Sequence, residues 1–265
     1  MRIIVPIKQV PETGAVKMDE ATGTVIREGV EAIVNPLDLY SIELAIRLRE
    51  KYGGEVVVIT MGPPSAEEAL REALAMGCDS AVLLTDRAFA GSDTWATSYT
   101  LSAGIRRMGA FDLVICGERA TDGETGQAGP GIAACLGLPV ATYVSGVEEV
   151  AGNEIQVRRL VEDGYEVLAL QMPAVLTVVK EIADPRLPTL ALKRKSRVAK
   201  IERWGCADLD VKREKLGLAG SPTHVVKIFR PKLSRECRMV EAGDDEKVER
   251  AADELVEFLR DKNII

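Results

Sequence analysis

The stretch that decides the fold is Phe111–Gly131, FDLVICGERATDGETGQAGPG. Residues 113–116 form a short apolar run, typical of a buried strand, which ends at Gly117. A loop rich in glycine, threonine and acidic residues follows. Pro130–Leu136 then has the apolar spacing of a helix, which Gly137 ends. The stretch therefore predicts a strand, a loop of small residues and a helix start, an arrangement by which parallel α/β sheets bind anions.

The residues of this loop favour a nucleotide without proving one. The N–H groups and dipole of a first helical turn attract a phosphate, and small residues let it approach the backbone. The chain has no GxxxxGK followed by Ser or Thr, and no GxGxxG after the first strand, so a P-loop triphosphatase is not predicted. Glu118, Asp122 and Glu124 suit ribose hydroxyls or a helix start better than a phosphate, and Arg119 adds one positive charge. A nucleotide loop and a tight turn both remain open.

Composition excludes several classes of function. A chain of 265 residues can form one large or two small domains, and its net charge of −7 argues against nucleic acid as the main partner. We expect no membrane span, because no run of 18 apolar residues occurs. The first residues are typical of a strand rather than a targeting peptide. Five cysteines without CxxC spacing indicate reduced thiols and a cytoplasmic protein.

Hydrolytic and metal chemistry are also not predicted. The single histidine, His224, lies in a polar stretch, and nothing nearby completes a zinc site or a Ser-His-Asp triad around it. We expect it at the surface or at an interface.

Strand and helix patterns alternate through the first 140 residues. Strands are predicted at 3–7, 55–61, 81–85 and 113–116, and helices at 35–52, 66–76, 94–108 and 130–136, with Asn35 as the cap of the first helix. This alternation predicts an α/β fold with a doubly wound parallel sheet, in which ligands bind beyond the carboxyl ends of the strands. Pro6, Met61, Asp86 and Gly117 fall at those ends, which supports a nucleotide site at 117–128.

The pattern changes after residue 141. Short strands are predicted at 143–150, 154–161, 165–170 and 174–179, with hairpin turns at Gly152-Asn153 and Asp163-Gly164. We expect them to form antiparallel sheet added to one edge.

The last third of the chain loses the core periodicity. Lys193–Arg197 is a basic run, which fits either a solvated face or a docking surface for a partner subunit. Residues 246–260 form a charged amphipathic helix. We therefore divide the chain into a nucleotide-binding core with edge hairpins, 1–190, and an extended C-terminal arm that ends in a helix, 191–265.

One segment resembles a known family. Val157–Thr177, VRRLVEDGYEVLALQMPAVLT, closely resembles the signature of electron-transfer flavoprotein beta subunits. The matching positions are Arg159, the turn Glu162-Asp163-Gly164, Glu166, Pro173 and the pair Val175-Leu176. The opening Val5–Gln9, the Asn35-Pro36 helix start and the Asp184-Pro185-Arg186 turn also resemble this family, in the same order, so the similarity covers essentially the whole chain.

The resemblance implies a Rossmann-like core, a heterodimer with a larger flavin-carrying alpha subunit, and an arm that packs on that partner. It also implies a nucleotide pocket among the ends of the first two strands, the Asn-Pro helix start and the glycine-rich loop. On this sequence the pocket residues are Pro6, Asn35, Asp38, Met61, Gly117, Glu118, Arg119, Ala120, Thr121, Asp122, Thr125, Gly126, Gln127 and Ala128. The amides of Gly126 and Gln127 are expected to hold a pyrophosphate, and Asp122 or Asn35 to meet sugar hydroxyls.

The family divides by the ligand of this pocket. Housekeeping members hold structural AMP, whereas electron-bifurcating members hold a second FAD that is reduced by NADH. The DGETGQAGP loop and the segment Gly91–Thr97 resemble the bifurcating type, in which Thr94 and Thr97 would face the flavin ring. These threonines also fit a helix cap and an ordinary helix position. We expect FAD, with AMP as the alternative, and we name no catalytic side chain because the flavin carries the redox chemistry.

The resemblance also implies a second partner. Arg186–Leu190 resembles the loop by which housekeeping members bind acyl-CoA dehydrogenases, with Leu190 as a hydrophobic anchor and Arg186 beside it. Leu190 also fits an ordinary leucine at the end of a strand. A bifurcating electron-transfer subunit is the first prediction, and a housekeeping subunit with AMP is the second. A universal-stress-type nucleotide-binding regulator is an alternative from another class.

Overall fold

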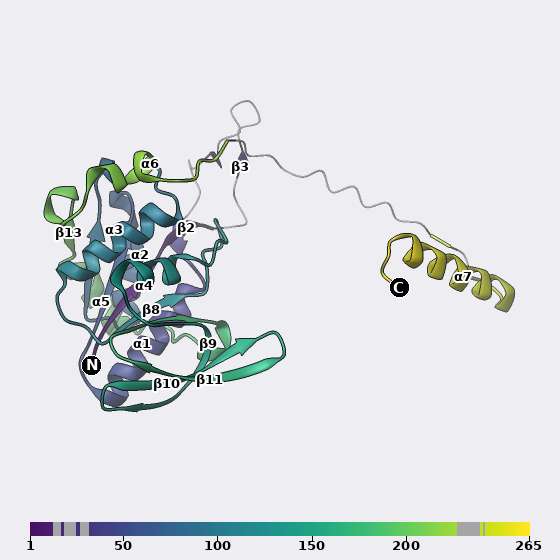
Figure 1. The fold of residues 1–265 in the computed structure, drawn as a ribbon, viewed down its shortest axis with the longest axis horizontal. Helices are drawn as coiled ribbons and strands as arrows, with labels where there is room; N and C mark the ends of the chain where they lie inside the picture. Colours follow the sequence, from purple (N-terminus) through teal and green to yellow (C-terminus); the bar gives the residue numbers. More distant parts are fainter. Residues whose placement is uncertain (13–16, 19–24, 27–31, 227–238, 241) are drawn as a thin grey trace. The chain divides into compact units, whose positions relative to one another are not determined.

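The computed structural model describes residues 1–12, 17–18, 25–26, 32–226, 239–240 and 242–265 (Figure 1). The chain divides into two units, Met1–Lys227 and Ile228–Ile265. The first unit contains a nine-stranded sheet with helices on both faces, and the second contains α7 (Asp245–Asp261). The predicted α/β fold and the predicted C-terminal helix are both confirmed.

The order of strands in the large sheet shows how the chain is wound. Across the sheet they are β11 (Gly164–Gln171), β10 (Glu154–Val161), β9 (Val140–Ala151), β12 (Ala174–Val178), β8 (Leu113–Gly117), β1 (Arg2–Pro6), β6 (Glu55–Met61), β7 (Ser80–Leu84) and β13 (Glu202–Trp204). All neighbours from β9 to β13 are parallel, whereas β9, β10 and β11 pair antiparallel. From β1 the chain adds β6 and β7 on one side, and then crosses to add β8 on the other.

Helices cover both faces of this sheet. On one face lie α1 (Asp38–Tyr52) and α2 (Glu67–Met76), with α5 (Leu190–Val198) packed on α2. On the other lie α3 (Thr94–Arg107) and α4 (Ala128–Leu136), which pack on each other. The short α6 (Gly217–Gly220) and 3-10 helices at Pro64–Ala66, Arg87–Phe89, Lys180–Ile182, Cys206–Asp208 and Arg213–Lys215 complete the helices described.

Two small two-stranded sheets follow β1. One pairs β2 (Gln9–Pro11) with β5 (Ala32–Val34), and the other pairs β3 (Lys17–Met18) with β4 (Val25–Ile26). The sequence is β-prone at 15–17 and 24–26, and these two pieces lie partly outside the described residues. Cys237, one of the five cysteines, lies outside them.

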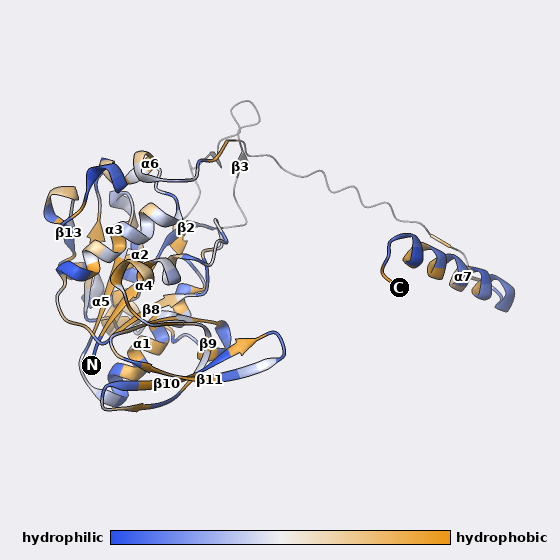
Figure 2. Ribbon diagram, viewed as in Figure 1, coloured by the Kyte–Doolittle hydropathy of each residue, from blue (hydrophilic) through white to orange (hydrophobic). Residues whose placement is uncertain are grey.

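Alternation along the central strands builds one core on each face. In β1, Ile3 and Val5 pack with α1 and α2, while Ile4 packs with α3 and α4, and all three are fully buried. Figure 2 shows the apolar colour concentrated on these strands beneath the helices. A parallel sheet buried on both faces needs near-continuous apolar strands, which is what the sequence provides.

The last predicted strand differs from the prediction. Residues 174–179 were expected in the antiparallel extension, but β12 lies parallel between β9 and β8. The reason is its composition: all five residues of β12 are buried, so the strand needs cover on both faces, as only an interior position offers. The predicted bounds of β6 and β10 are confirmed.

The first compact unit extends past the predicted division at residue 190. Helix α5 packs on α2, β13 pairs with β7, and Leu209 and Leu216 are buried. Four of the nine residues of α5 are Lys or Arg and only Ser196 is buried, so no apolar periodicity marked this helix.

Two glycines let α4 lie directly against its neighbours. A methyl carbon at Gly129 would be 2.3 Å from Cγ2 of Thr177 on β12, and one at Gly131 would be 2.4 Å from Oγ of Ser98 on α3. Neither separation is possible between nonbonded atoms. The start of α4 is therefore fixed against the sheet and against α3 by the absence of these two side chains.

Gly129→Ala should lower the free energy of unfolding by about 1–3 kcal/mol, the usual range for overpacking. Thr177→Ser removes the clashing methyl group but keeps the hydroxyl that accepts a hydrogen bond from the Tyr143 N–H at 3.2 Å. The double variant should therefore regain most of the loss. Gly123→Ala is the control, since nothing lies within 4 Å of a methyl group there. Urea unfolding measures all three, and a Gly129→Ala chain as stable as the control would contradict this packing.

Candidate nucleotide-binding site

The predicted loop lies where the strand order reverses. β1 ends at Pro6, β8 ends at Gly117, and the two strands are adjacent in the sheet. The chain then continues to α1 on one face and to α4 on the other. Beyond the carboxyl ends of such a pair a crevice opens, and this is where doubly wound sheets bind ligands.

A buried amide joins the two sides of this crevice. The side chain of Asn35 is fully buried; its Nδ2 donates to the carbonyl of Arg119 at 2.9 Å, and its Oδ1 accepts from the N–H of Thr121 at 3.1 Å. Its own N–H donates to the carbonyl of Lys8 at 2.8 Å. Asn35 was predicted to cap α1, but no side chain caps that helix, because this amide instead holds the loop that follows β8.

Asp38 is a buried carboxylate at the ends of β1 and β8. Its carboxylate is 6% exposed, and Oδ2 accepts from the N–H of Lys8 at 2.7 Å. Oδ1 lies beside Gly117, where a methyl carbon would come within 2.3 Å of it. Burial raises the pKa of Asp38 to about 7, although hydrogen bonds from the backbone of Lys8 and the side chain of Asn35 oppose the shift.

The acidic residues of the loop are partly neutralised. Lys8 Nζ is 2.7 Å from Oδ1 of Asp122, and Arg119 Nη1 is 2.7 Å from Oε1 of Glu118. These pairs reduce the repulsion that the two carboxylates would exert on an anionic ligand nearby. The negative charge of the loop is therefore compatible with a phosphate.

The loop delivers the open end of α4 to the crevice. Glu124 and Gly126 have positive φ values of 51° and 62°, and the N–H of Glu124 donates to the carbonyl of Ala120 at 2.8 Å. Gln127 stands at the cap position, and no side chain of the described residues caps the helix. The first N–H groups of α4, those of Ala128 and Gly129, therefore remain available to a ligand.

Helix α3 closes the other side of the loop. Oγ1 of Thr94 is 3.4 Å from Oγ1 of Thr125, and Oγ of Ser98 donates to the carbonyls of Thr94 (2.8 Å) and Ala128 (3.3 Å). Among the predicted site residues, Thr97 and Met61 are partly buried, and no hydrogen bond between either side chain and the loop is found in the described part of the chain.

The polar groups fit the phosphate part of a nucleotide. Oγ1 of Thr121 is buried and has no hydrogen-bond partner among the described residues, so this hydroxyl and the uncapped start of α4 both offer polar contacts to a ligand. Both side-chain atoms of Asn35 are already hydrogen-bonded within the protein, so Asp122 is the better candidate for a sugar hydroxyl.

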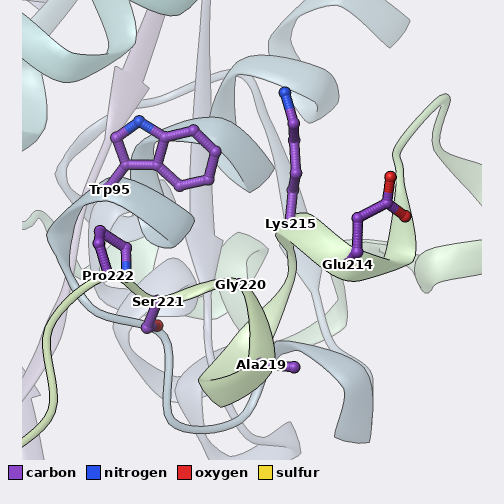
Figure 3. A pocket seen from close by; sticks show the side chains of 7 residues that line it. All are labelled: Trp95, Glu214, Lys215, Ala219, Gly220, Ser221 and Pro222. Carbon is purple, nitrogen blue, oxygen red and sulfur yellow. The ribbon is translucent and has the colours of Figure 1, made fainter.

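A separate pocket of about 440 Å³ lies on the outer side of α3 (Figure 3). It is lined by Trp95, Glu214, Lys215, Ala219, Gly220, Ser221 and Pro222. The rings of Trp95 and Tyr99 stack with their centroids 5.7 Å apart, and Lys215 Nζ is within 6 Å of both rings. None of the predicted site residues lines this pocket, and the chemistry of the loop does not depend on it.

The sequence left two residues of the site unassigned. Lys8 connects β1 both to Asp38 and to Asp122, and Ser98 connects α3 to the start of α4. A cation directly after a predicted strand end, opposite an acidic loop, was a usable signal for Lys8. Ser98 had no comparable signal, because a small polar residue inside a helix is common.

The described residues offer no metal site and no membrane-spanning helix. They place no group of three or more His, Cys, Asp or Glu side chains where a metal ion would be held. Among the helices resolved there, none has both the length and the apolar character needed to cross a membrane.

A doubly wound parallel sheet with an uncapped helix start at its switch point places the chain among the α/β proteins of Rossmann-like fold, many of which bind a nucleotide at that point. Comparison with known proteins gives the family. The electron transfer flavoprotein domain matches residues 22–209. The electron transfer flavoprotein subunit beta of Thermoanaerobacterium thermosaccharolyticum is 46% identical over 266 residues, covering 100% of both chains.

Two further relatives have different names. Subunit CarD of the caffeyl-CoA reductase-Etf complex of Acetobacterium woodii is 46% identical over 266 residues, again covering 100% of both chains. Protein FixA of Azorhizobium caulinodans is 45% identical over 243 residues, which cover 89% of this chain and 86% of that one. The chain belongs to the electron transfer flavoprotein family and is a member of its beta subunits. The predicted family is confirmed, and the universal-stress-type alternative is no longer needed.

Asp38→Asn should remove a pH dependence of stability. The carboxyl titrates near 3.8 when unfolded and at about 7 in the fold, so the folded chain retains a proton that the unfolded chain has released. The stability that this group contributes is present below its unfolded pKa and is lost as the pH rises through 7, on the order of 4 kcal/mol in total.

Between about pH 4 and about pH 7, the wild-type chain should therefore lose stability relative to Asp38→Asn, as measured by urea unfolding, and the difference should level off above about pH 7. Asp163→Asn, an exposed change in the turn between β10 and β11, should run parallel to the wild type. Parallel curves for Asp38→Asn and the wild type would show that Asp38 is ionised in the fold throughout.

Proposed function

We propose that this chain is the beta subunit of a heterodimeric electron-transfer flavoprotein that holds FAD at residues 117–128 and takes part in flavin-based electron bifurcation with NADH as donor. Family membership supports the electron-transfer role. The observation that carries the site is the uncapped start of α4 at the switch point between β1 and β8. AMP in the same position is the alternative ligand.

The chain's own residues would bind and orient the cofactor. The N–H groups of Ala128 and Gly129 would hold the diphosphate, and the hydroxyl of Thr121 would add a polar contact. Thr94, whose hydroxyl is 3.4 Å from that of Thr125, would offer a polar contact to the ring system of the cofactor. When bound, FAD would supply the redox chemistry, namely acceptance of a hydride and its release as two electrons and a proton.

The apolar side chains of the second unit support the proposal of a partner subunit. Helix α7 has no buried residue, and it carries Val248, Leu255, Val256 and Phe258 at least one-third exposed. An amphipathic helix with an uncovered apolar stripe is typical of a segment that packs on another chain. We propose that the arm, which includes residues 228–265, packs on the electron-transfer flavoprotein alpha subunit.

Two exposed leucines beside the basic residues of α5 support docking of a redox partner. Leu187 and Leu190 are 89% and 67% exposed, next to the basic helix α5. The relative CarD is named as part of a caffeyl-CoA reductase-Etf complex, and this favours an enzyme of CoA thioesters as the partner. We propose an acyl-CoA dehydrogenase or a related flavoenzyme. The cysteines within the described residues are free thiols, which fits a reducing cytoplasm.

The nucleotide content of the heterodimer tests the proposal. The chain should co-purify with the alpha subunit, and acid extraction followed by chromatography should yield about two FAD per heterodimer, one for each subunit. One FAD together with one AMP would overturn the bifurcating assignment and leave the housekeeping one. A flavin-free, nucleotide-free heterodimer would contradict both.

Ala128→Asp tests the position of the phosphates. A carboxylate in the first turn of a helix interacts favourably with the helix dipole, so the folded chain should keep its stability within about 1 kcal/mol. The same carboxylate repels a diphosphate, and nucleotide occupancy of the beta subunit should fall at least about tenfold, which corresponds to about 1.4 kcal/mol.

Ala128→Asn is the matched control, since it has a similar size without the charge. Full occupancy in Ala128→Asp would mean that the phosphates bind elsewhere.

A further inference from the structure

The segment that exposes Leu187 and Leu190 is held to the core by its neighbour Arg186. The backbone N–H of Arg186 donates to Oε2 of Glu43 at 3.1 Å, and its guanidinium donates to both oxygens of Glu43, at 2.8 and 3.2 Å. The same guanidinium donates to both oxygens of Glu50, at 2.6 and 3.0 Å. Arg186 therefore faces α1 with nearly all its donors engaged, and it has little capacity left to contact a partner.

The carboxylate at the centre of this network is buried. Glu43 is 2% exposed. A second arginine, Arg47 on α1 itself, donates to Oε1 of Glu43 at 2.6 Å and to the carbonyl of Asp184 at 3.2 Å. Burial opposes the ionisation of Glu43, but the hydrogen bonds from Arg186 and Arg47 outweigh it and hold the pKa of Glu43 below its ordinary value. Positions 43, 47 and 50 thus hold residues 184 and 186 from one side of α1.

The other end of the segment is held as well. Helix α5 begins at Leu190 with Thr189 as its cap, whose Oγ1 accepts from the N–H of Leu192 at 3.2 Å. At its end, Arg71 of α2 donates to the carbonyls of Ser196 (2.6 Å) and Arg197 (3.0 Å). The two exposed leucines therefore lie between two charged anchors.

We infer that Glu43 and Glu50, acting through Arg186, are positioning residues that fix residues 184–190 so that Leu187 and Leu190 are presented in one arrangement to a redox partner. This inference rests on the proposed docking function of those leucines. Arg186 then serves the docking surface from behind and does not itself contact the partner. A surface held in its bound arrangement loses less conformational entropy on binding, and this raises affinity.

Amide hydrogen exchange in the full-chain heterodimer tests the positioning directly. In Glu43→Gln, the amides of residues 185–192 should exchange about tenfold faster or more than in the wild type, because local opening becomes easier. Glu50→Gln removes only the exposed half of the network and should give a smaller increase, about threefold. If Glu43→Gln does not fold, Glu50→Gln alone tests whether the network positions the segment. Glu148→Gln is the control, because it breaks an exposed pair with Arg158 elsewhere. Unchanged exchange at 185–192 in both variants would overturn the inference.

A kinetic measurement separates this inference from the docking proposal. The probe is an acyl-CoA dehydrogenase reduced with its acyl-CoA substrate, with electron transfer to the heterodimer as the readout. Glu43→Gln should raise the KM for the heterodimer severalfold and leave kcat unchanged, and Leu190→Ser should do the same without changing exchange at 185–192. Docking at this segment would be refuted if Glu43→Gln exchanged faster but neither Glu43→Gln nor Leu190→Ser changed the KM. The inferred purpose of the network would then be refuted as well.

Discussion

A single buried amide fixes the geometry on which the site depends. The Asn35 side chain joins the start of α1 to the loop after β8 through the backbone of Arg119 and Thr121. Because the amide is fully buried, breaking either bond would leave a polar group without a partner, at a cost of about 1–3 kcal/mol. Moving the loop away from the switch point would therefore cost free energy, and the start of α4 stays directed at the crevice.

Two buried carboxylates of α1 serve the molecule in opposite ways. Asp38 has only N–H donors within hydrogen-bond distance, so burial dominates and its pKa rises to about 7. Glu43 has two arginines against it, and its pKa falls. The Asp38 carboxylate lies against the backbone at the ends of β1 and β8, where the absence of a side chain at Gly117 leaves room for it. The charged environment of Glu43 fixes a surface segment. One helix thus organises both the proposed cofactor site and the proposed docking surface.

Much of the fold followed from local patterns. Alternating apolar runs and glycine stops gave the central strands and helices, and the loop at 117–128 lies at the switch point as expected. What failed depended on contacts distant in sequence. The position of β12 inside the sheet follows from the burial of the strand on both faces. Helix α5 is stabilised by Arg71 and by packing on α2, and neither contact can be predicted from the periodicity of the α5 residues.

The candidate site shows the same division. Loop residues and strand ends were visible in the sequence, but the direction of each side chain was not. Asn35 was expected to cap a helix, but its side chain holds the loop through residues 119 and 121, and the Asp38 carboxylate is bonded to the backbone of Lys8. Polar side chains near a predicted crevice have a choice of partners, and the sequence does not reveal that choice before the backbone is placed.

The most direct measurement is the crystal structure of the co-purified heterodimer at a resolution that defines phosphate groups. A diphosphate or phosphate should lie within hydrogen-bond distance of the backbone nitrogens of Ala128 and Gly129, with the Asn35 amide still bonded to residues 119 and 121. A start of α4 covered by protein side chains, or a nucleotide whose phosphates lie away from it, would contradict the central claim.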